Sequence, residues 1–350
     1  MFSHALVLAS FILLVPAIPS AAGSSAFEWR NLPDLPQALG GQFVGVVDGH
    51  LVVAGGSFFF TPPWSGGTKQ WVDTIYALGP NETSWRLVGH LPTPLGYGVA
   101  ITAPHGMLCI GGQTPTGNSR QTLLLRFQGN KIVIDHLADL PETAANMAGA
   151  LTGDTVYVAG GQETPTSTAA LHNFWSLSLS ASQAHWSALP PWPGPPRIFP
   201  EMVASGSSLY LISGASLTGT LGPPPGRKFL SDAYCYTPGK GWRSIASPPQ
   251  PTAGGLATVV EGRVRVLGGN DGSLASHEFE IKDRHPGFSK TVFQFDPETK
   301  HWSAVGQMPY ALVTTGLAVW DNQVVIAGGE DRPSHRSAHV MAGHISKGSR

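Results

Sequence analysis

The sequence is poor in charge and in cysteine. Only 12% of its 350 residues are Asp, Glu, Lys or Arg, and the formal net charge is -1. It lacks the basic stripe with which proteins bind phosphate backbones, so we expect no nucleic-acid partner. Its two cysteines, Cys109 and Cys235, lie in separate strand-like runs. This favours two buried thiols over a disulfide, and it excludes a cysteine-rich metal site.

The chain also lacks a long hydrophobic run. An apolar stretch at residues 5–18 is shorter than the about 20 residues that a membrane-spanning helix needs. The small residues Ser20 and Ala22 follow it. This pattern predicts a secretory signal peptide in residues 1–22, although no Lys or Arg precedes the apolar stretch. We therefore expect a periplasmic or secreted protein without a membrane partner, whose folded part spans residues 23–350.

Several catalytic motifs are missing as well. The sequence contains no Gly-x-Ser-x-Gly nucleophile turn, no phosphate-binding glycine loop and no HExxH helix. His335 and His339 suggest a metal site, but no second cluster of ligands accompanies them, and surface histidines are the better interpretation. We expect no metal and no cofactor.

Glycine and proline, in contrast, are abundant, with 43 and 30 copies. They divide the apolar residues into short segments, which favours an all-β fold. Apolar segments ending in Gly-Gly recur every 49 to 60 residues, at Gly55, Gly111, Gly160, Gly268 and Gly328, with Ser213-Gly214 as a degenerate sixth copy. This spacing matches the kelch repeat, whose period is about 50 residues.

Each repeat predicts four short strands, which in the first copy are residues 42–47, 50–54, 74–78 and 84–88. Such a sheet cannot bury both faces alone, so the copies must pack around an axis. Residues 27–33 have the pattern of a fourth strand, but no Gly-Gly doublet precedes them. The last repeat, in contrast, lacks a fourth strand. We predict a six-bladed kelch-type β-propeller closed by the N-terminal strand. A two-sheet sandwich is the alternative.

The residues that follow the doublets should gather near the axis on one face of the propeller. They are Ser57, Gln113, Gln162, Ala215, Asn270 and Glu330. Only Glu330 is ionisable, and Arg336 follows it six residues later. Burial raises the pKa of such a carboxyl and a guanidinium lowers it, so the sequence leaves open whether Glu330 is a base or an acid. The alternative is an exposed ion pair.

Other side chains should reach the same face. Three connections, residues 57–71, 215–229 and 270–289, are longer than a turn requires and could either roof a pocket or decorate the surface. The candidate substrate-binding residues are Lys69, Arg197, Gln42, Gln113 and Asn270. A polar ring with one carboxylate and a few cations suits a small anionic ligand. Glu163 and Asp271 could supply the second carboxylate of a glycosidase, but neither directly follows a doublet.

Three segments carry a resemblance to a known family: residues 95–99 with 108–113, residues 64–73, and residues 293–302. They resemble segments of the kelch-type sialic acid mutarotases, the N-acetylneuraminate epimerases. Residues 95–99 with 108–113 resemble the final blade of that family, residues 64–73 resemble a loop, and residues 293–302 resemble a segment that runs from the third strand of a blade to the fourth. The loop is similar to that of the cyclically permuted branch of this family. The resemblance covers almost everything after the predicted signal.

The family's acid/base glutamate follows the glycine of a second strand and precedes an arginine by six residues, and Glu330 and Arg336 match this pattern. The resemblance implies an isomerase that interconverts the α and β anomers of N-acetylneuraminate through the open keto form. Glu330 would transfer protons and Arg336 would hold the carboxylate of this small sugar acid. A non-catalytic kelch propeller that binds a protein partner or a glycan is the alternative.

Overall fold

The computed structural model describes residues 27–181, 184–219 and 226–345, so the predicted signal peptide lies outside the described part of the chain. The described residues form six four-stranded antiparallel sheets and three two-stranded hairpins, and their single α-helix is four residues long. None of their helices is long and apolar enough to cross a membrane. Cys109 and Cys235 are buried free thiols, as predicted.

The six sheets are the blades of a propeller. The first three blades in chain order are β2 (Phe43–Val47), β3 (His50–Ala54), β6 (Thr74–Leu78) and β7 (Arg86–His90); β8 (Val99–Ala103), β9 (Gly106–Ile110), β12 (Thr122–Gln128) and β13 (Lys131–His136); β14 (Ala148–Thr152), β15 (Thr155–Ala159), β16 (Phe174–Ser178) and β17 (Ser187–Ala188). The last three are β18 (Glu201–Ser205), β19 (Ser208–Ile212), β22 (Ala233–Thr237) and β23 (Gly241–Ile245); β24 (Leu256–Val260), β25 (Arg263–Leu267), β26 (Thr291–Asp296) and β27 (His301–Gln307); β28 (Leu317–Trp320), β29 (Gln323–Arg332), β30 (His335–Ile345) and β1 (Phe27–Leu32).

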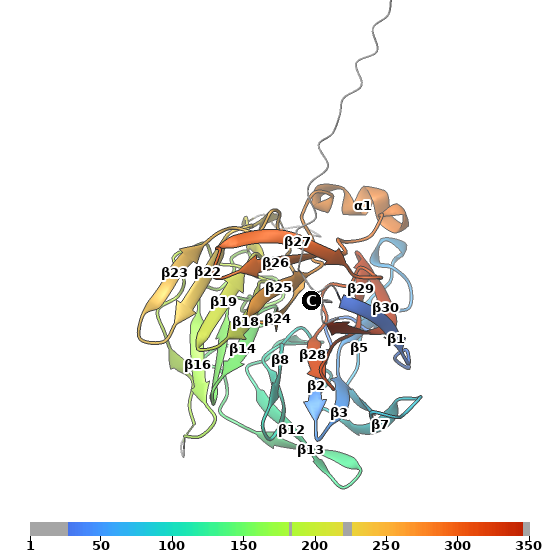
Figure 1. The fold of residues 1–350 in the computed structure, drawn as a ribbon. Coiled ribbons are helices and arrows are strands. Elements are labelled where there is room, and N and C mark those ends of the chain that lie inside the picture. The colour runs from blue at the N-terminus through green and yellow to red at the C-terminus, as the bar shows by residue number, and fades with distance from the viewer. Residues whose placement is uncertain (1–26, 182–183, 220–225, 346–350) are drawn as a thin grey trace, which may run out of the picture.

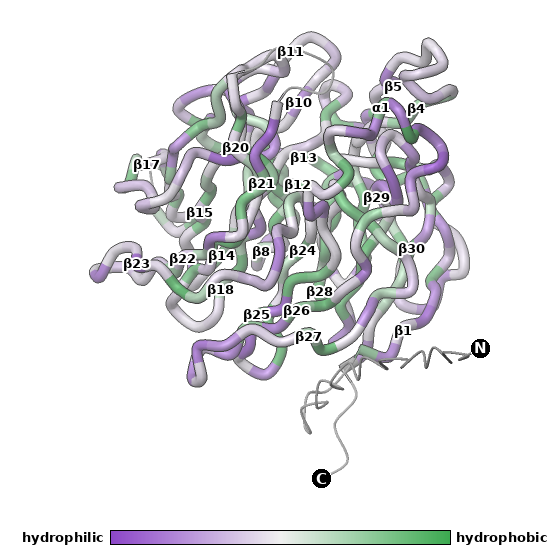
Figure 2. The backbone as a smooth tube through the Cα atoms, turned by 90° about the horizontal axis from the view of Figure 1, so that it is seen from above, coloured by the Kyte–Doolittle hydropathy of each residue, from purple (hydrophilic) through white to green (hydrophobic). Residues whose placement is uncertain are grey.

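The long connections contain structure of their own. They form three hairpins and a run of short helices: β4 (Ser57–Phe59) with β5 (Lys69–Trp71), β10 (Gln113–Thr114) with β11 (Gly117–Asn118), β20 (Ala215–Leu217) with β21 (Arg227–Phe229), the 3-10 helices η1 (Pro63–Ser65), η2 (Ala275–His277) and η3 (Lys282–Arg284), and α1 (Glu278–Ile281). Figure 2 shows the hairpins and α1 together at one end of the molecule. This end carries the candidate site.

The blades form a closed ring. Their first strands, β2, β8, β14, β18, β24 and β28, contact one another in succession around the axis (Figure 1). The N-terminal strand β1 pairs antiparallel with β30 from Phe27 opposite Ile345 to Leu32 opposite Val340, and so supplies the fourth strand of the last blade. The prediction of six blades closed by the N-terminal strand is confirmed.

The core lies between the blades. Six clusters of buried side chains each join two neighbouring blades, including the last and the first. In β3, Val52 and Ala54 contact the second blade, whereas Leu51 and Val53 contact the sixth. Successive side chains of a strand point to opposite faces, and here both faces are covered. This explains why the second strand of each repeat is an unbroken apolar run.

The Gly-Gly doublets have the backbone conformation that the sequence predicts. Gly55 and Gly56 have φ values of 62° and 108°, where side chains with a Cβ are strained. A Cβ on Gly55 would also lie 2.1 Å from the carbonyl oxygen of Leu95, in the connection to the next blade. The doublet therefore allows adjacent blades to approach closely near the axis.

Candidate active site

A ring of six backbone hydrogen bonds surrounds the axis and forms the floor of the site. One residue in the connection entering each blade has a left-handed backbone, with φ between 49° and 72°. Each donates its N–H to the carbonyl of its counterpart in the preceding blade over 2.6 to 3.0 Å, and the first donates to the last. We call these residues the axial belt: Gly41, Tyr97, Asn146, Phe199, Gly254 and Thr314.

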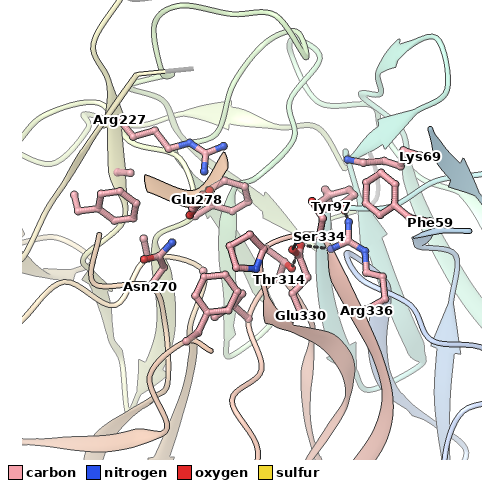
Figure 3. Close-up of a pocket in the computed structure, with 18 of the residues that line it drawn as sticks. Phe59, Lys69, Tyr97, Arg227, Asn270, Glu278, Thr314, Glu330, Ser334 and Arg336 are labelled. Carbon is pink, nitrogen blue, oxygen red and sulfur yellow. Dashed lines mark hydrogen bonds and ion pairs between the residues drawn. The ribbon is translucent and has the colours of Figure 1, made fainter. Parts of the chain in front are cut away.

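A cavity of about 350 Å³ lies on this floor. Tyr97, Phe199, Gly254 and Thr314 of the axial belt contribute to its lining. The walls come from the hairpin β4–β5, from β21 and α1, and from the turn between β29 and β30 (Figure 3). The long connections thus do roof a pocket, and its volume suits a small molecule.

Glu330 and Arg336 face each other on one wall of this pocket. They lie opposite each other in the pairing of β29 with β30, and Nη1 of Arg336 forms an ion pair with Oε1 of Glu330. Their side chains are only 14% and 6% exposed. This excludes the alternative of an exposed ion pair, and it supports the prediction that the pair borders the axial cavity.

Further hydrogen bonds hold the two side chains of this pair. The hydroxyl of Thr314 donates to Oε1 of Glu330 over 2.8 Å, and the backbone N–H of Ser334 donates to Oε2 over 3.0 Å. Nη2 of Arg336 donates to the hydroxyl of Tyr97 over 2.7 Å, and the guanidinium carbon lies 5.1 Å from the centre of the Phe59 ring. The axial belt thus supplies one contact to each member of the pair.

The surroundings decide the ionisation of Glu330. Burial raises its pKa, but the charge of Arg336, the Thr314 hydroxyl and the charge of Lys69 together bring the pKa below its ordinary value. Glu330 is therefore ionised at neutral pH and can accept a proton. Burial lowers the pKa of Arg336, but the interactions with Glu330 and Tyr97 raise it by more, so the pKa lies above its ordinary value. Arg336 therefore remains a cation.

The opposite wall carries a second pair of charged residues, Arg227 on β21 and Glu278 on α1 (Figure 3). The guanidinium carbon of Arg227 lies 5.5 Å from the centre of the Phe199 ring. Burial raises the pKa of Glu278, while the charge of Arg227 lowers it and that of Glu330 raises it. With Lys69, the described lining residues comprise three cations and two carboxylates, a balance that favours a monoanionic ligand.

The predicted substrate-binding residues do not all reach the pocket. Lys69 and Asn270 line it, and the ammonium of Lys69 lies 4.5 Å from the centre of the Tyr97 ring. Gln42 instead borders a smaller axial cavity of about 100 Å³, where its amide donates to the hydroxyl of Thr315 over 2.8 Å. Gln113 pairs with Asn118 in the hairpin β10–β11 and is absent from the pocket lining.

The structure corrects the prediction for Arg197. This side chain is fully buried, and both terminal nitrogens of its guanidinium bind the carboxylate of Asp232, over 2.9 and 2.7 Å. Nη1 also donates to the carbonyl of Ser213 in the degenerate sixth doublet. Arg197 therefore stabilises that doublet and does not face the pocket.

The site residues predicted from the sequence did not include Arg227, Glu278, Tyr97 or Thr314. Arg227 and Glu278 lie in the long connections 215–229 and 270–289, whose length was a signal but whose course was not predictable. Tyr97 and Thr314 share their position in the repeat with Gly41 and Asn146, so no common residue type marks the axial belt. His335 and His339 are both about half exposed, as surface histidines should be.

A family model described as N-acetylneuraminate epimerase matches residues 20–134 and 137–280. The chain belongs to the N-acetylneuraminate epimerase family. The matched residues include Lys69, Arg227 and Glu278, and they end before Glu330 and Arg336. The placement of Glu330 and Arg336 in the pocket therefore rests on the geometry described above and not on the family match.

Curated relatives and a solved structure agree with this assignment. Proteins named N-acetylneuraminate epimerase from Yersinia pestis (strain Pestoides F) and Haemophilus influenzae (strain PittEE) are 35% and 33% identical over 131 and 129 residues. These stretches cover 32% and 31% of this chain and 33% of each relative, so the chain spans about a third of the length of the relatives it matches. A solved chain titled "Structure of YjhT" superposes with a TM-score of 0.68 over 91% of this chain and 98% of its own. At 15% identity, this likeness shows the shared fold alone.

Proposed function

We propose that this protein is a carbohydrate mutarotase that interconverts the α and β anomers of N-acetylneuraminate. The observation that carries the proposal is the buried Glu330–Arg336 pair at the wall of a small polar pocket, in a chain of the N-acetylneuraminate epimerase family. The excess of cations in the pocket suits a sugar acid. We further propose that the protein acts in the periplasm or is secreted, in keeping with the signal peptide predicted from residues 1–22.

The reaction requires that one proton leave the anomeric hydroxyl while the ring oxygen gains one. The ionised carboxylate of Glu330 accepts the hydroxyl proton and delivers it to the ring oxygen as the bond between the anomeric carbon and that oxygen breaks, so the carboxylate is ionised again in the open form. The open keto form then rotates about its carbon chain and closes on the other face. No net proton is released, and the reaction itself needs no redox or group-transfer partner.

Arg336 and its neighbours keep Glu330 ready for this role. Oε1 of Glu330 is held by Arg336 and Thr314, whereas Oε2 accepts a single hydrogen bond among the described residues, from Ser334. A carboxylate oxygen offers more than one acceptor site, so Oε2 can also accept the substrate hydroxyl. A bound sugar carboxylate, as a like charge, raises the pKa of Glu330 and makes it a better base.

Anomer exchange followed by NMR tests the proposal. Freshly dissolved N-acetylneuraminate equilibrates spontaneously, and catalytic amounts of the protein should shorten that equilibration at neutral pH. If the protein binds the sugar acid and leaves the exchange rate unchanged, it is a glycan-binding propeller and the catalytic proposal fails. If it neither binds the sugar acid nor alters its exchange, a protein-binding propeller becomes the better account.

A further inference from the structure

The three cations of the pocket differ in what already engages them. Arg336 is held by Glu330, by the hydroxyl of Tyr97 and by the ring of Phe59. The ammonium of Lys69 lies over two aromatic rings, 4.5 Å from the centre of Tyr97 and 5.1 Å from that of Trp71. Both residues stand on the wall of Glu330, and both lower its pKa. The charges of Arg336 and Lys69 thus help to keep Glu330 ionised.

Arg227 is the exception. Among the described residues, no carboxylate lies within ion-pair distance of its guanidinium, whereas Arg336 forms an ion pair with Glu330. Nε of Arg227 is also buried without a hydrogen-bond partner, as is Nε of Arg336. Burial lowers its pKa, while the charges of Glu278 and Glu330 act in the opposite sense. A buried guanidinium donor without a partner among the protein groups carries a desolvation cost, and an anionic ligand would satisfy it.

The position of Arg227 suits such a ligand. The ring of Phe199 lies 5.5 Å from its guanidinium carbon, and Figure 3 shows the side chain on the wall facing Glu330. Phe199 belongs to the axial belt, so the platform beneath Arg227 is fixed to the same floor that holds Thr314 against Glu330. The two walls are therefore held at a defined separation.

We propose that Arg227 is the carboxylate-binding residue of this pocket and determines its specificity for sugar acids over neutral sugars. This inference rests on the proposed function for the identity of the ligand. In a 2-keto sugar acid the carboxylate and the anomeric hydroxyl are attached to one carbon, so their binding groups must share one cavity. Arg227 and Glu330 line the same cavity from opposite walls. Arg227 thus takes over the anchoring role that the family resemblance implied for Arg336, whose guanidinium forms an ion pair with Glu330.

Equilibrium binding tests the inference with two probes, N-acetylneuraminic acid and its methyl ester, which differ in the carboxylate charge. In Arg227→Gln the dissociation constant of the acid should rise about 10- to 100-fold, as expected when a charged hydrogen-bonding partner is removed. Arg227→Lys should show a smaller rise, because an ammonium cannot bind both oxygens in the planar geometry of a guanidinium. The ester should bind all three proteins about equally.

Lys228 provides the matched control, since it is the exposed neighbour of Arg227 on β21. Lys228→Gln removes the same charge from the same strand and should leave binding of both probes unchanged. Thermal unfolding of the variants checks that β21 stays folded. Equal losses for acid and ester in Arg227→Gln would show a structural role and overturn the inference, as would unchanged binding of the acid.

The outcomes also separate this inference from the proposed function. If the wild type distinguishes acid from ester through Arg227 but does not accelerate anomer exchange, the mutarotase proposal fails and the inference stands. If the wild type accelerates exchange and Arg227→Gln binds the acid normally, the inference fails and the mutarotase proposal stands.

Discussion

Arg336 owes its position to the absence of a side chain at Gly40. A Cβ at this glycine would lie 2.7 Å from Cδ and 2.8 Å from Nε of Arg336. The φ of Gly40 lies outside the left-handed region, so an added methyl group would cause no backbone strain. The glycine thus leaves room for a buried guanidinium, and one methyl group can test what that guanidinium does.

Gly40→Ala should displace Arg336 and reduce the acceleration of anomer exchange by about 10- to 100-fold, because small misplacements of catalytic groups are costly. No charged group is removed, so a loss of activity would report on geometry. The measurement is the exchange rate by NMR. Gly117→Ala is the control, since a Cβ there meets no atom within 4 Å and its φ is unstrained. Wild-type exchange in Gly40→Ala would show that the position of Arg336 is unimportant.

The pKa of a second buried carboxylate, Glu201 at the start of β18, is shifted in the opposite direction to that of Glu330. Burial raises its pKa well above the ordinary value, and the hydrogen bonds from Thr252 and Gly255 and the charge of Arg197 only partly oppose this. Since the folded-state pKa exceeds the unfolded one, the stability that Glu201 contributes is fully present below the unfolded pKa. It is lost as the pH rises through the folded-state pKa.

Glu201→Gln should therefore stabilise the protein at alkaline pH relative to the wild type, and the difference should shrink as the pH falls toward the unfolded pKa of a glutamate. The amide imitates the protonated carboxyl and carries no charge to desolvate. Urea unfolding at pH 5 and pH 8 measures this difference. A variant that is less stable than the wild type by the same amount at both values would contradict the assignment.

Sequence reasoning at this scale succeeded where a residue breaks the repeat. Glu330 stood out because the other five residues that follow a doublet are not ionisable, and the structure places it in the pocket. Arg197 occupies an equally suggestive position, but Asp232, which lies far along the chain, binds its guanidinium. Arg227 could not be assigned because its hairpin lies outside the repeat pattern. Charge alone does not reveal which cations remain without a partner.

Among the elements, the axial belt links the fold to the site. Tyr97, Asn146, Phe199 and Thr314 have φ values between 49° and 59°, a conformation that costs about 1 kcal/mol or more for residues with a Cβ. The ring of hydrogen bonds holds them there. The side chains of Thr314, Tyr97 and Phe199 contact Glu330, Arg336 and Arg227, respectively, whereas Asn146 borders the smaller axial cavity. The backbone strain therefore coincides with the pocket.

The two glycines of the axial belt allow a paired test. Gly254→Ala should cost about 1 kcal/mol of unfolding free energy from its φ of 71° and preserve activity, because a Cβ there meets its nearest neighbour at 3.7 Å. Gly41→Ala has the same strain, but its Cβ would lie 2.7 Å from the Tyr97 ring. It should be the less stable variant and should also slow anomer exchange. Denaturation and NMR exchange measure both, and equal behaviour of the two variants would contradict this role for Tyr97.

The strands of the blades could be predicted from the sequence, whereas the axial belt and the hairpins and helix α1 that cover the pocket could not. In the first repeat the second and third strands match the predicted residues 50–54 and 74–78, because alternate apolar residues must cover two faces. The fourth strand begins at Arg86, two residues later than predicted. The hairpin β4–β5 and helix α1 depend on contacts across the pocket, and segments of three or four residues are too short to show a periodicity.

At the scale of the whole molecule, tryptophan side chains in or next to the outer strands tie four of the six blades to the preceding blade. The indole N–H of Trp85 donates to the carbonyl of Pro33, and Trp186, Trp242 and Trp302 bind Ala138, Pro190 and Ala246 in the same way. This repeated bond explains why a tryptophan marks four of the six repeats. The circle is completed by β1, which joins the first part of the chain to the last blade.

Removal of β1 should open the ring. A chain beginning at Pro33 should have a lower urea midpoint than one beginning at Gly23, because it leaves one edge of β30 unpaired and part of the interface with the fifth blade exposed. The free edge should also promote self-association, which light scattering would detect. Equal midpoints for the two chains would show that β1 contributes little to closure.

The central claim is that the ionised carboxylate of Glu330 transfers the proton in a pocket built by the closed ring. The most direct measurement compares anomer exchange of N-acetylneuraminate by NMR in the wild type and in Glu330→Gln, each saturated with ligand. The account predicts that the wild type accelerates exchange and that the variant, which keeps the shape of the side chain but cannot accept a proton, exchanges at the spontaneous rate. Acceleration by the variant equal to that of the wild type would contradict the account.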